Sequence, residues 1–131
     1  MNESAWYAEL IKPEWAPPAW IFGPVWTVLY TLIAISFSWV FYQIIKGKIP
    51  HVVAVPFVIN IVSNALFTPL QFGLQNNVLA LADILVVLGS IIWLMKTIWP
   101  YAKWVVYINI PYLIWVSFAT FLQLNITLLN L

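Results

Sequence analysis

The chain alternates between long apolar stretches and short polar breaks. The four long stretches cover about residues 19–45, 52–74, 78–96 and 104–129. At about 1.5 Å per helical residue, stretches of this length can cross the ~30 Å hydrocarbon layer of a membrane. Because the breaks between them are short, consecutive helices should run antiparallel. The pattern predicts an all-α membrane protein, an antiparallel bundle of four transmembrane helices.

The segment before the first stretch has a different character. Residues 1–18 contain three glutamates, one lysine and three prolines. Charges are costly in lipid and prolines interrupt helices, so this segment is predicted to form a lid outside the membrane. Pro17 and Pro18 should set the start of the first helix. Since no linker or repeat is evident, residues 1–131 are predicted to form a single domain.

Composition excludes several classes of function. Hydrophobic residues make up 64% of the chain and charged residues 7%, whereas about a quarter of a soluble domain is charged. The absence of cysteine excludes disulfides and thiol chemistry. A net charge of +1 without arginine argues against a nucleic-acid partner. His51 has no second ligand nearby in the sequence, so no metal site is predicted.

The lysines predict an orientation in the membrane. Four of the five lysines fall in the two breaks that should lie on the same side, and the other side carries Lys12 together with three glutamates. Cytoplasmic loops are enriched in lysine and arginine. We therefore expect the lysine-containing breaks in the cytoplasm and both termini outside. The four lysines are Lys46, Lys48, Lys96 and Lys103.

Each stretch carries polar or aromatic side chains on one face at helical spacing. Amide groups are costly in lipid, so the faces that carry them should point inward. The interior is thus predicted to be lined by tryptophan, tyrosine and amide groups. These faces consist of Phe22, Trp26 and Tyr30; of Asn60, Asn64, Phe67 and Gln71; of Asp83 and Ser90; and of Tyr112, Trp115, Ala119 and Gln123.

These faces have structural explanations as well as functional ones. Tryptophans near the ends of spans are typical of an interfacial belt, whereas Trp26 and Trp115 lie well inside their spans, where lining a pocket and plain packing are both open. The amide face can equally hold helices together. For Asp83, capping of the helix or pairing with the N-terminal segment is favoured over a proton relay.

Interior prolines predict that three of the four helices bend. Proline removes an amide donor and frees a carbonyl group in the preceding turn. Bent helices leave space between them, but such kinks also serve packing alone. The prolines are Pro24, Pro56, Pro69 and Pro111.

Three motifs resemble the TspO/MBR family of tryptophan-rich sensory proteins and translocator proteins. They are WYAELIKPEWAPPAWIFGPVWTVLY at residues 6–30, NALFTPLQFG at 64–73 and PYLIWVSFATFLQLNITLLN at 111–130. The resemblance implies a small helical membrane protein, often dimeric, that binds tetrapyrroles such as protoporphyrin IX or haem. It also implies integration into a membrane, here the bacterial inner membrane. Some members bind sterols or benzodiazepine-type ligands.

The resemblance further implies a pocket between helices, covered by the lid. Family pocket positions map onto Tyr7, Trp26, Asn64, Asp83, Trp115, Phe118 and Ala119. Together with the inward faces, the candidate ligand-binding residues are Tyr7, Phe22, Trp26, Tyr30, Asn60, Asn64, Phe67, Gln71, Asp83, Trp115, Phe118 and Ala119.

Some bacterial members are reported to break down porphyrin. The tryptophans implicated match Trp26 and Trp115, which are the catalytic candidates if that reaction occurs here. The main expectation is a binder that senses, handles or transports porphyrins and requires no cofactor. A porphyrin-degrading enzyme and a small membrane transporter or scaffold are the alternatives.

Two departures from the family affect these expectations. Family members have five spans, the first of them before the motif that starts here at Trp6. Either that helix is encoded upstream of Met1, or a homodimer compensates for it through the small-residue stripe Ala19, Gly23 and Thr27. The family's C-terminal sterol motif ends in a basic residue, and none follows Lys103, so sterol binding there is not expected.

Three residues depart from the family's usual pattern. Phe67 stands where the family usually has tryptophan, Gln71 where it has phenylalanine, and Gln123 where it has asparagine. We expect the changes at Phe67 and Gln71 to alter the shape and polarity of the implied pocket without abolishing it.

Overall fold

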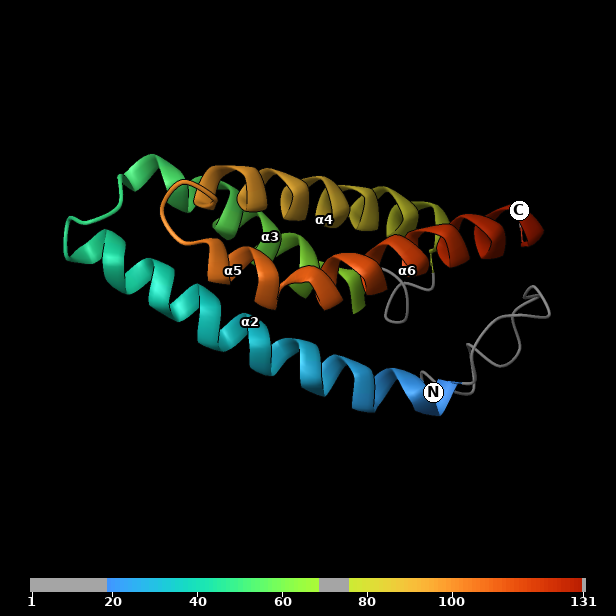
Figure 1. Cartoon of the computed structure of the whole chain (residues 1–131). Coiled ribbons are helices and arrows are strands. Elements are labelled where there is room, and N and C mark those ends of the chain that lie inside the picture. The colour runs from blue at the N-terminus through green and yellow to red at the C-terminus, as the bar shows by residue number, and fades with distance from the viewer. Residues whose placement is uncertain (1–18, 69–75, 131) are drawn as a thin grey trace.

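The computed structural model describes residues 19–68 and 76–130, and every regular element in these ranges is helical (Figure 1). The lid segment 1–18, with Tyr7, and Gln71 lie outside the described residues. In chain order the elements are η1 (Ala19–Ile21), α2 (Phe22–Ile45), η2 (His51–Val53), α3 (Ala54–Thr68), α4 (Asn77–Ile98), α5 (Lys103–Ile108) and α6 (Ile110–Leu129).

Three of these helices are long and apolar enough to cross a membrane. They are Gly23–Ile45 in α2, Asn77–Ile98 in α4 and Ile110–Leu129 in α6, and a shorter apolar helix covers His51–Phe67. The all-α membrane bundle is therefore confirmed. The second stretch expected from the sequence, 52–74, is described as far as Thr68.

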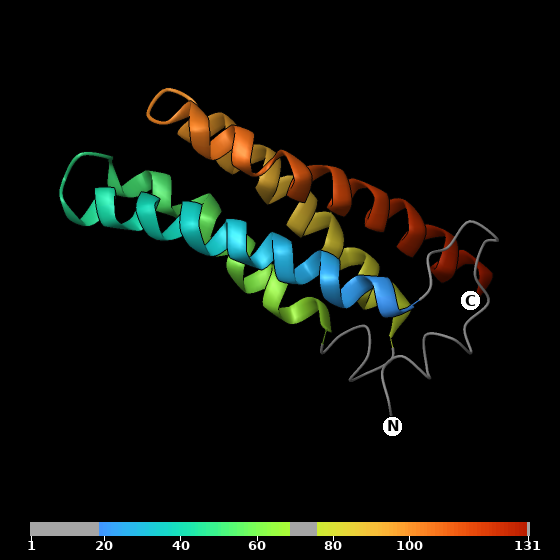
Figure 2. The same cartoon turned by 60° about the horizontal axis from the view of Figure 1, so that its bottom comes forward.

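In chain order, α2, α3, α4 and the pair α5–α6 run antiparallel to one another, and α4 is the central helix (Figures 1 and 2). α4 makes its main contacts with α3 on one side and α6 on the other, while α2 contacts α3 and α5. The turns at 46–50 and 99–102 lie at one end of the bundle, and the start of α2 and the end of α6 lie at the other.

α2 is anchored mainly through its C-terminal half. Ser36, Phe37, Val40 and Ile44 are buried there, and the ring of Phe37 packs edge-on against that of Phe57 in α3 at 4.8 Å between centroids. Among the described side chains of the N-terminal half, Leu29 is the one that is buried. The first turns of α2 are consequently less tightly held by the bundle than the last ones.

The fourth stretch is not one helix, because it is broken at Asn109 between α5 and α6. Pro111 has no amide hydrogen for the carbonyl of Tyr107, which explains a break at this level. The buried side chain of Asn109 bridges the break, since Nδ2 donates to the Val105 carbonyl at 2.8 Å and to Ser36 Oγ in α2 at 3.0 Å. The interrupted helix is thereby tied to α2.

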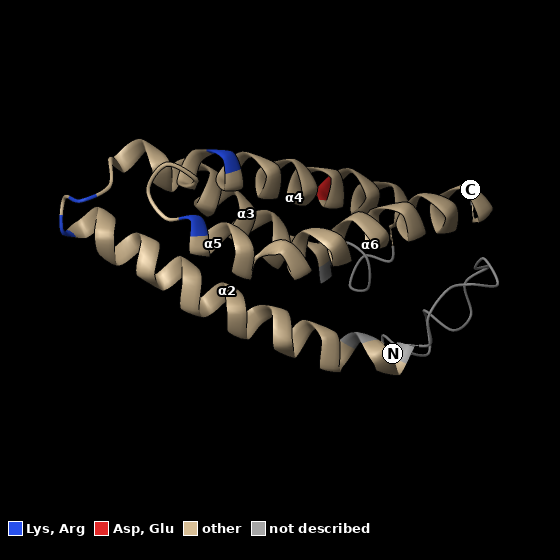
Figure 3. Ribbon diagram, viewed as in Figure 1, with Lys and Arg blue, Asp and Glu red and all other residues tan. Residues whose placement is uncertain are grey.

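The lysines of the described residues gather at the end that holds the two turns (Figure 3). Lys46 Nζ lies 5.4 Å from the ring centroid of Tyr42, and Lys103 Nζ lies 5.1 Å from that of Trp99. Lysines paired with aromatic rings at one end of an apolar bundle are typical of a membrane–water interface.

The bond between Ser36 and Asn109 predicts a measurable loss of stability. Ser36→Ala should lower the free energy of unfolding in detergent by about 0.5–1.5 kcal/mol, because Asn109 loses a buried partner. Circular dichroism during denaturant titration measures it. Ser38→Ala is the matched control on the exposed face of α2 and should change stability by less than about 0.5 kcal/mol. Equal losses in the two variants would contradict the role given to this bond.

Candidate functional site

Hydrogen-bonded side chains connect α2, α3 and α6 near the middle of the bundle. The Tyr30 hydroxyl donates to Asn64 Oδ1 at 3.1 Å, and Asn64 Nδ2 donates to the Tyr112 hydroxyl oxygen at 2.6 Å. The Tyr112 hydroxyl then donates to Asn60 Oδ1 at 3.1 Å. Because Asn60 and Asn64 are four residues apart, both lie on the same face of α3.

The same connection continues into α4. Asn60 Nδ2 donates to Ser90 Oγ at 3.0 Å and to the Val87 carbonyl at 3.4 Å, and the Ser90 hydroxyl donates to that carbonyl at 2.8 Å. We call the side chains of Tyr30, Asn64, Tyr112, Asn60 and Ser90 the polar relay. It joins one side chain or more from each of α2, α3, α4 and α6.

The polar relay is buried at its α4 and α6 side chains and exposed at its end on α2. Asn60 and Tyr112 are each 1% exposed and Ser90 is 3% exposed, whereas Tyr30 is 49% exposed. A buried amide or hydroxyl without a partner costs several kcal/mol in an apolar medium, roughly 2–7. The relay satisfies these groups internally and ends at a hydroxyl that the surroundings of the bundle can reach.

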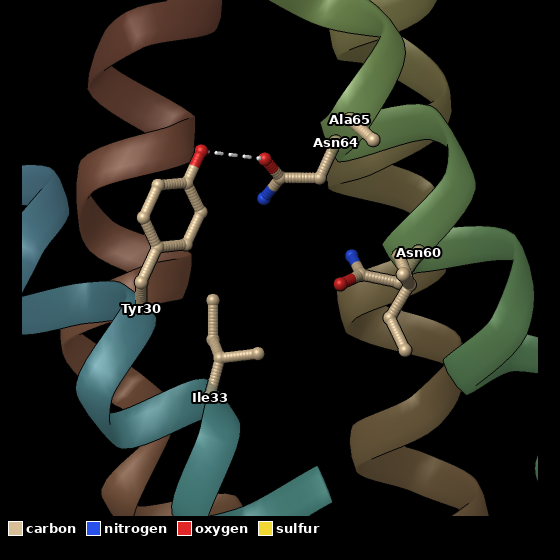
Figure 4. A pocket seen from close by; sticks show the side chains of 6 residues that line it. Tyr30, Ile33, Asn60, Asn64 and Ala65 are labelled. Carbon is tan, nitrogen blue, oxygen red and sulfur yellow. Dashed lines mark hydrogen bonds between the residues drawn. The ribbon is translucent and has the colours of Figure 1, made fainter.

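A cavity of about 240 Å³ lies at that accessible end, between α2 and α3 (Figure 4). Its walls are mostly apolar, and its polar groups belong to the relay. Figure 4 shows the Tyr30 hydroxyl and the Asn64 amide meeting across the space between the two helices. The lining residues are Tyr30, Ile33, Asn60, Ile61, Asn64 and Ala65.

Trp26 brings a further aromatic ring to the same end of the relay. Its ring centroid lies 5.2 Å from that of Tyr30 at an interplanar angle of 31°, and 6.3 Å from that of Tyr112 at 73°. Both distances are within the range of favourable aromatic pairs. The structure therefore brings four sequence-predicted residues together around Tyr112, namely Trp26, Tyr30, Asn60 and Asn64.

Four other candidate residues, Phe67, Trp115, Phe118 and Ala119, are not among the lining residues of this cavity. On α6, the rings of Trp115 and Phe118 pair at 5.6 Å. Trp115, Ala119 and Phe67 are partly buried against the apolar core and do not line the cavity. Phe22 is the first residue of α2.

Asp83 is buried in α4 and does not cap that helix. The cap is Asn76, whose Oδ1 accepts from the Leu79 amide at 3.0 Å, so the capping role expected for Asp83 is wrong. Asp83 lies further along the helix, is 9% exposed, and its Oδ2 has no hydrogen-bond partner among the described residues. The alternative of pairing with the N-terminal segment involves residues outside those described.

Sequence reasoning placed Tyr112 and Ser90 on inward faces but gave neither a role at the site. The sequence signal for them was indirect: the amides of Asn60 and Asn64 need hydrogen-bond partners when they are buried. The sequence could not identify the apolar lining residues Ile33, Ile61 and Ala65, because the apolar residues of a cavity wall do not differ in pattern from other apolar residues of a membrane helix.

Known proteins are similar to this chain over most or nearly all of its length. The model of the TspO/MBR family matches residues 1–129. The chain is 34% identical over 127 residues to the tryptophan-rich protein TspO of Chlorobaculum tepidum, with 97% of this chain and 80% of the relative covered. It is 32% identical over 135 residues to a tryptophan-rich sensory protein of Cereibacter sphaeroides, covering 99% and 80%. To the human translocator protein it is 33% identical over 126 residues, covering 90% and 70%.

Tyr112 should be the side chain on which the relay depends most. Tyr112→Phe removes a hydroxyl that both donates to Asn60 and accepts from Asn64, so we expect the free energy of unfolding to fall by about 1–3 kcal/mol. Thermal unfolding in detergent tests this. Tyr107→Phe alters an exposed tyrosine and should stay within about 0.5 kcal/mol of the parent. A Tyr112→Phe protein as stable as Tyr107→Phe would contradict the assignment.

Proposed function

Because the chain belongs to the TspO/MBR family, we propose that this membrane protein binds a tetrapyrrole, protoporphyrin IX or haem, between α2 and α3. In this proposal it serves the sensing, handling or transport of porphyrins or similar hydrophobic molecules. The observation that carries the proposal is the grouping of Trp26, Tyr30 and the Asn64 amide at an otherwise apolar cavity.

This chemistry suits a flat macrocycle with polar edges. Aromatic side chains offer the π faces on which such a ring stacks, and small-molecule sites combine apolar walls with a few placed polar groups. Tyr30 and Trp26 supply the rings here, and Asn64 supplies an amide between them and the interior. Because the Tyr30 side chain is half exposed, a ligand dissolved in the lipid can reach the cavity beside it.

The size of the cavity sets a condition on this function. A volume of about 240 Å³ is below the roughly 300–1,000 Å³ of typical small-molecule sites. A tetrapyrrole must therefore displace the N-terminal half of α2 or remain partly in the lipid. The distribution of buried residues in α2 favours displacement, because its anchors Phe37, Val40 and Ile44 lie in the other half.

Degradation of the bound porphyrin is the second candidate function. Of the two catalytic candidates, Trp26 contacts the relay tyrosines, whereas Trp115 pairs with Phe118 and is not a lining residue of the cavity. Trp26 is thus the better placed indole for an oxidative, light-assisted reaction with a ligand in this cavity.

We also propose that the protein forms a homodimer in the bacterial inner membrane. Gly23 and Thr27 are both exposed, and a Cβ atom at Gly23 would meet nothing within 4 Å. Such small positions let a second helix approach closely. The end that holds the lysines of the described residues should face the cytoplasm.

Trp26 provides the main test of binding. Trp26→Phe should raise the Kd for protoporphyrin IX about three- to tenfold, because the phenyl ring offers a smaller π face than the indole and no N–H group. The shift of the porphyrin Soret band measures Kd without depending on the number of tryptophans. Trp93→Phe, exposed on α4, is the control and should leave Kd unchanged. Unchanged affinity in Trp26→Phe would place the ligand elsewhere.

Loss of the Soret band under light in the parent and in Trp93→Phe, but not in Trp26→Phe, would favour degradation.

The orientation is testable because the chain contains no cysteine. A membrane-impermeant maleimide should label Lys48→Cys only after the membrane is permeabilised, since Lys48 lies in the exposed turn between α2 and α3. Ser4→Cys should be labelled in intact cells. The reverse pattern would invert the proposed topology.

A further inference from the structure

The direction of the polar relay is set at its buried end. A backbone carbonyl can only accept hydrogen bonds. The Val87 carbonyl accepts from the Ser90 hydroxyl and from Asn60 Nδ2, and Ser90 Oγ, having given its hydrogen to Val87, accepts from Asn60 as well. With Asn60 reversed, its carbonyl oxygen would face the Val87 carbonyl, which also only accepts, and the Ser90 hydroxyl would have to leave Val87 to donate to Asn60. The orientation that keeps both bonds to Val87 has the nitrogen of Asn60 toward α4 and its oxygen toward Tyr112.

The rest of the relay follows from that one orientation. Tyr112 has a single hydroxyl hydrogen, and it gives this hydrogen to Asn60 Oδ1. Its oxygen can then only accept from Asn64, so the Asn64 nitrogen faces the interior and Oδ1 faces α2. Tyr30 in turn must donate its hydroxyl hydrogen to Asn64 Oδ1, which is the bond observed.

The hydrogen-bonding capacity that remains at the cavity is mainly that of acceptors. Tyr30 has given away its hydrogen, and Asn60 uses both of its N–H groups on α4. Free lone pairs remain on the oxygens of Tyr30 and Asn64. Among the described side chains that line the cavity, the second N–H of Asn64 is the one remaining donor, and none of these side chains is cationic.

We infer that this cavity selects ligands that present a neutral hydrogen-bond donor, such as a hydroxyl group, to Tyr30, and that it discriminates against a carboxylate there. A carboxylate is an acceptor only and would face unpaired oxygens in an apolar site. Tyr30 is then the specificity-determining residue, and Tyr112 is a positioning residue that acts through Asn64. The inference rests on the proposed function, because it specifies how the same cavity recognises its ligand.

Three porphyrins with one common frame test the inference. Haematoporphyrin dimethyl ester carries two hydroxyethyl groups, mesoporphyrin dimethyl ester carries ethyl groups in their place, and mesoporphyrin diacid at pH 8 carries carboxylates. The Kd of each is measured from the Soret band, in one detergent, for the parent protein and for Tyr30→Phe. Comparing the two proteins for each ligand cancels differences in partitioning into detergent.

Tyr30→Phe should weaken binding of the hydroxyl-bearing ester about three- to tenfold, the effect of one hydrogen bond, and leave the other two porphyrins within about twofold. This variant removes only the last hydroxyl of the relay, so the remaining bonds hold Asn64 in place. Tyr112→Phe should reduce the same preference although Tyr30 is intact, because Asn64 is then free to turn. A purely structural role of Tyr112 would shift all three affinities equally.

The remaining outcomes separate this inference from the proposed function. Equal effects of Tyr30→Phe on the hydroxyethyl and ethyl esters would overturn the inference and leave porphyrin binding standing. Weakening of the diacid alone would overturn it as well, because Tyr30 would then act as the donor. Failure of all three porphyrins to bind the parent protein would refute the proposed function and the inference together.

Discussion

A polar side chain inside a bundle surrounded by lipid has no water to bond with, and this constraint decides how the helices of this protein meet. Asn60 is almost completely buried, and its side chain forms hydrogen bonds to other helices, to Tyr112 in α6 and to Ser90 and Val87 in α4. Hydrogen bonds between helices in membranes are individually modest, on average about 0.6 kcal/mol. Their larger effect is on specificity, because a helix that shifts by one position leaves an amide unpaired.

Polar contacts of this kind occur at three levels of the bundle. Near the lysine end, Asn109 bonds Ser36 and joins the broken fourth stretch to α2. The polar relay lies further along. At the opposite end, Gln123 Nε2 donates to the Asn77 carbonyl at 3.3 Å and links α6 to the start of α4. Apolar side chains such as Phe37 and Phe57 fill the levels between them, so the polar groups set the register and the apolar groups supply most of the burial.

The sequence predicted the all-α membrane bundle and the shared face of the two amides of α3, because both depend on local periodicity. The spacing of Asn60 and Asn64 placed two amides on one face, and the structure brings Trp26 and Tyr30 to the same site. The partners of these groups could not be predicted in the same way. Tyr112 lies 52 residues from Asn60, and several tyrosines were equally available to it. Nor did composition distinguish Asn76 from Asp83 as the cap of α4, since both residue types cap helices.

The position of the cavity follows from how unequally α2 is held. Toward its C-terminus, α2 is fixed by the packing of Phe37 against Phe57 and by the bond from Asn109 to Ser36. Toward its N-terminus, the polar tie to α3 among the described residues is the bond between Tyr30 and Asn64, and a bond of this kind contributes about 0.5–1.5 kcal/mol net. Widening the cavity for a macrocycle therefore has to overcome mainly the packing of Leu29 and Trp26, and a ligand that enters while the bond between Tyr30 and Asn64 is kept meets the acceptor oxygens of the relay. Opening at the other half of α2 would separate a buried aromatic pair and an amide with no water to replace its partner. The N-terminal half of α2 has fewer contacts with the bundle, and this leaves the cavity beside Tyr30. For the same reason, this cavity is the least costly place for a ligand to enter the bundle.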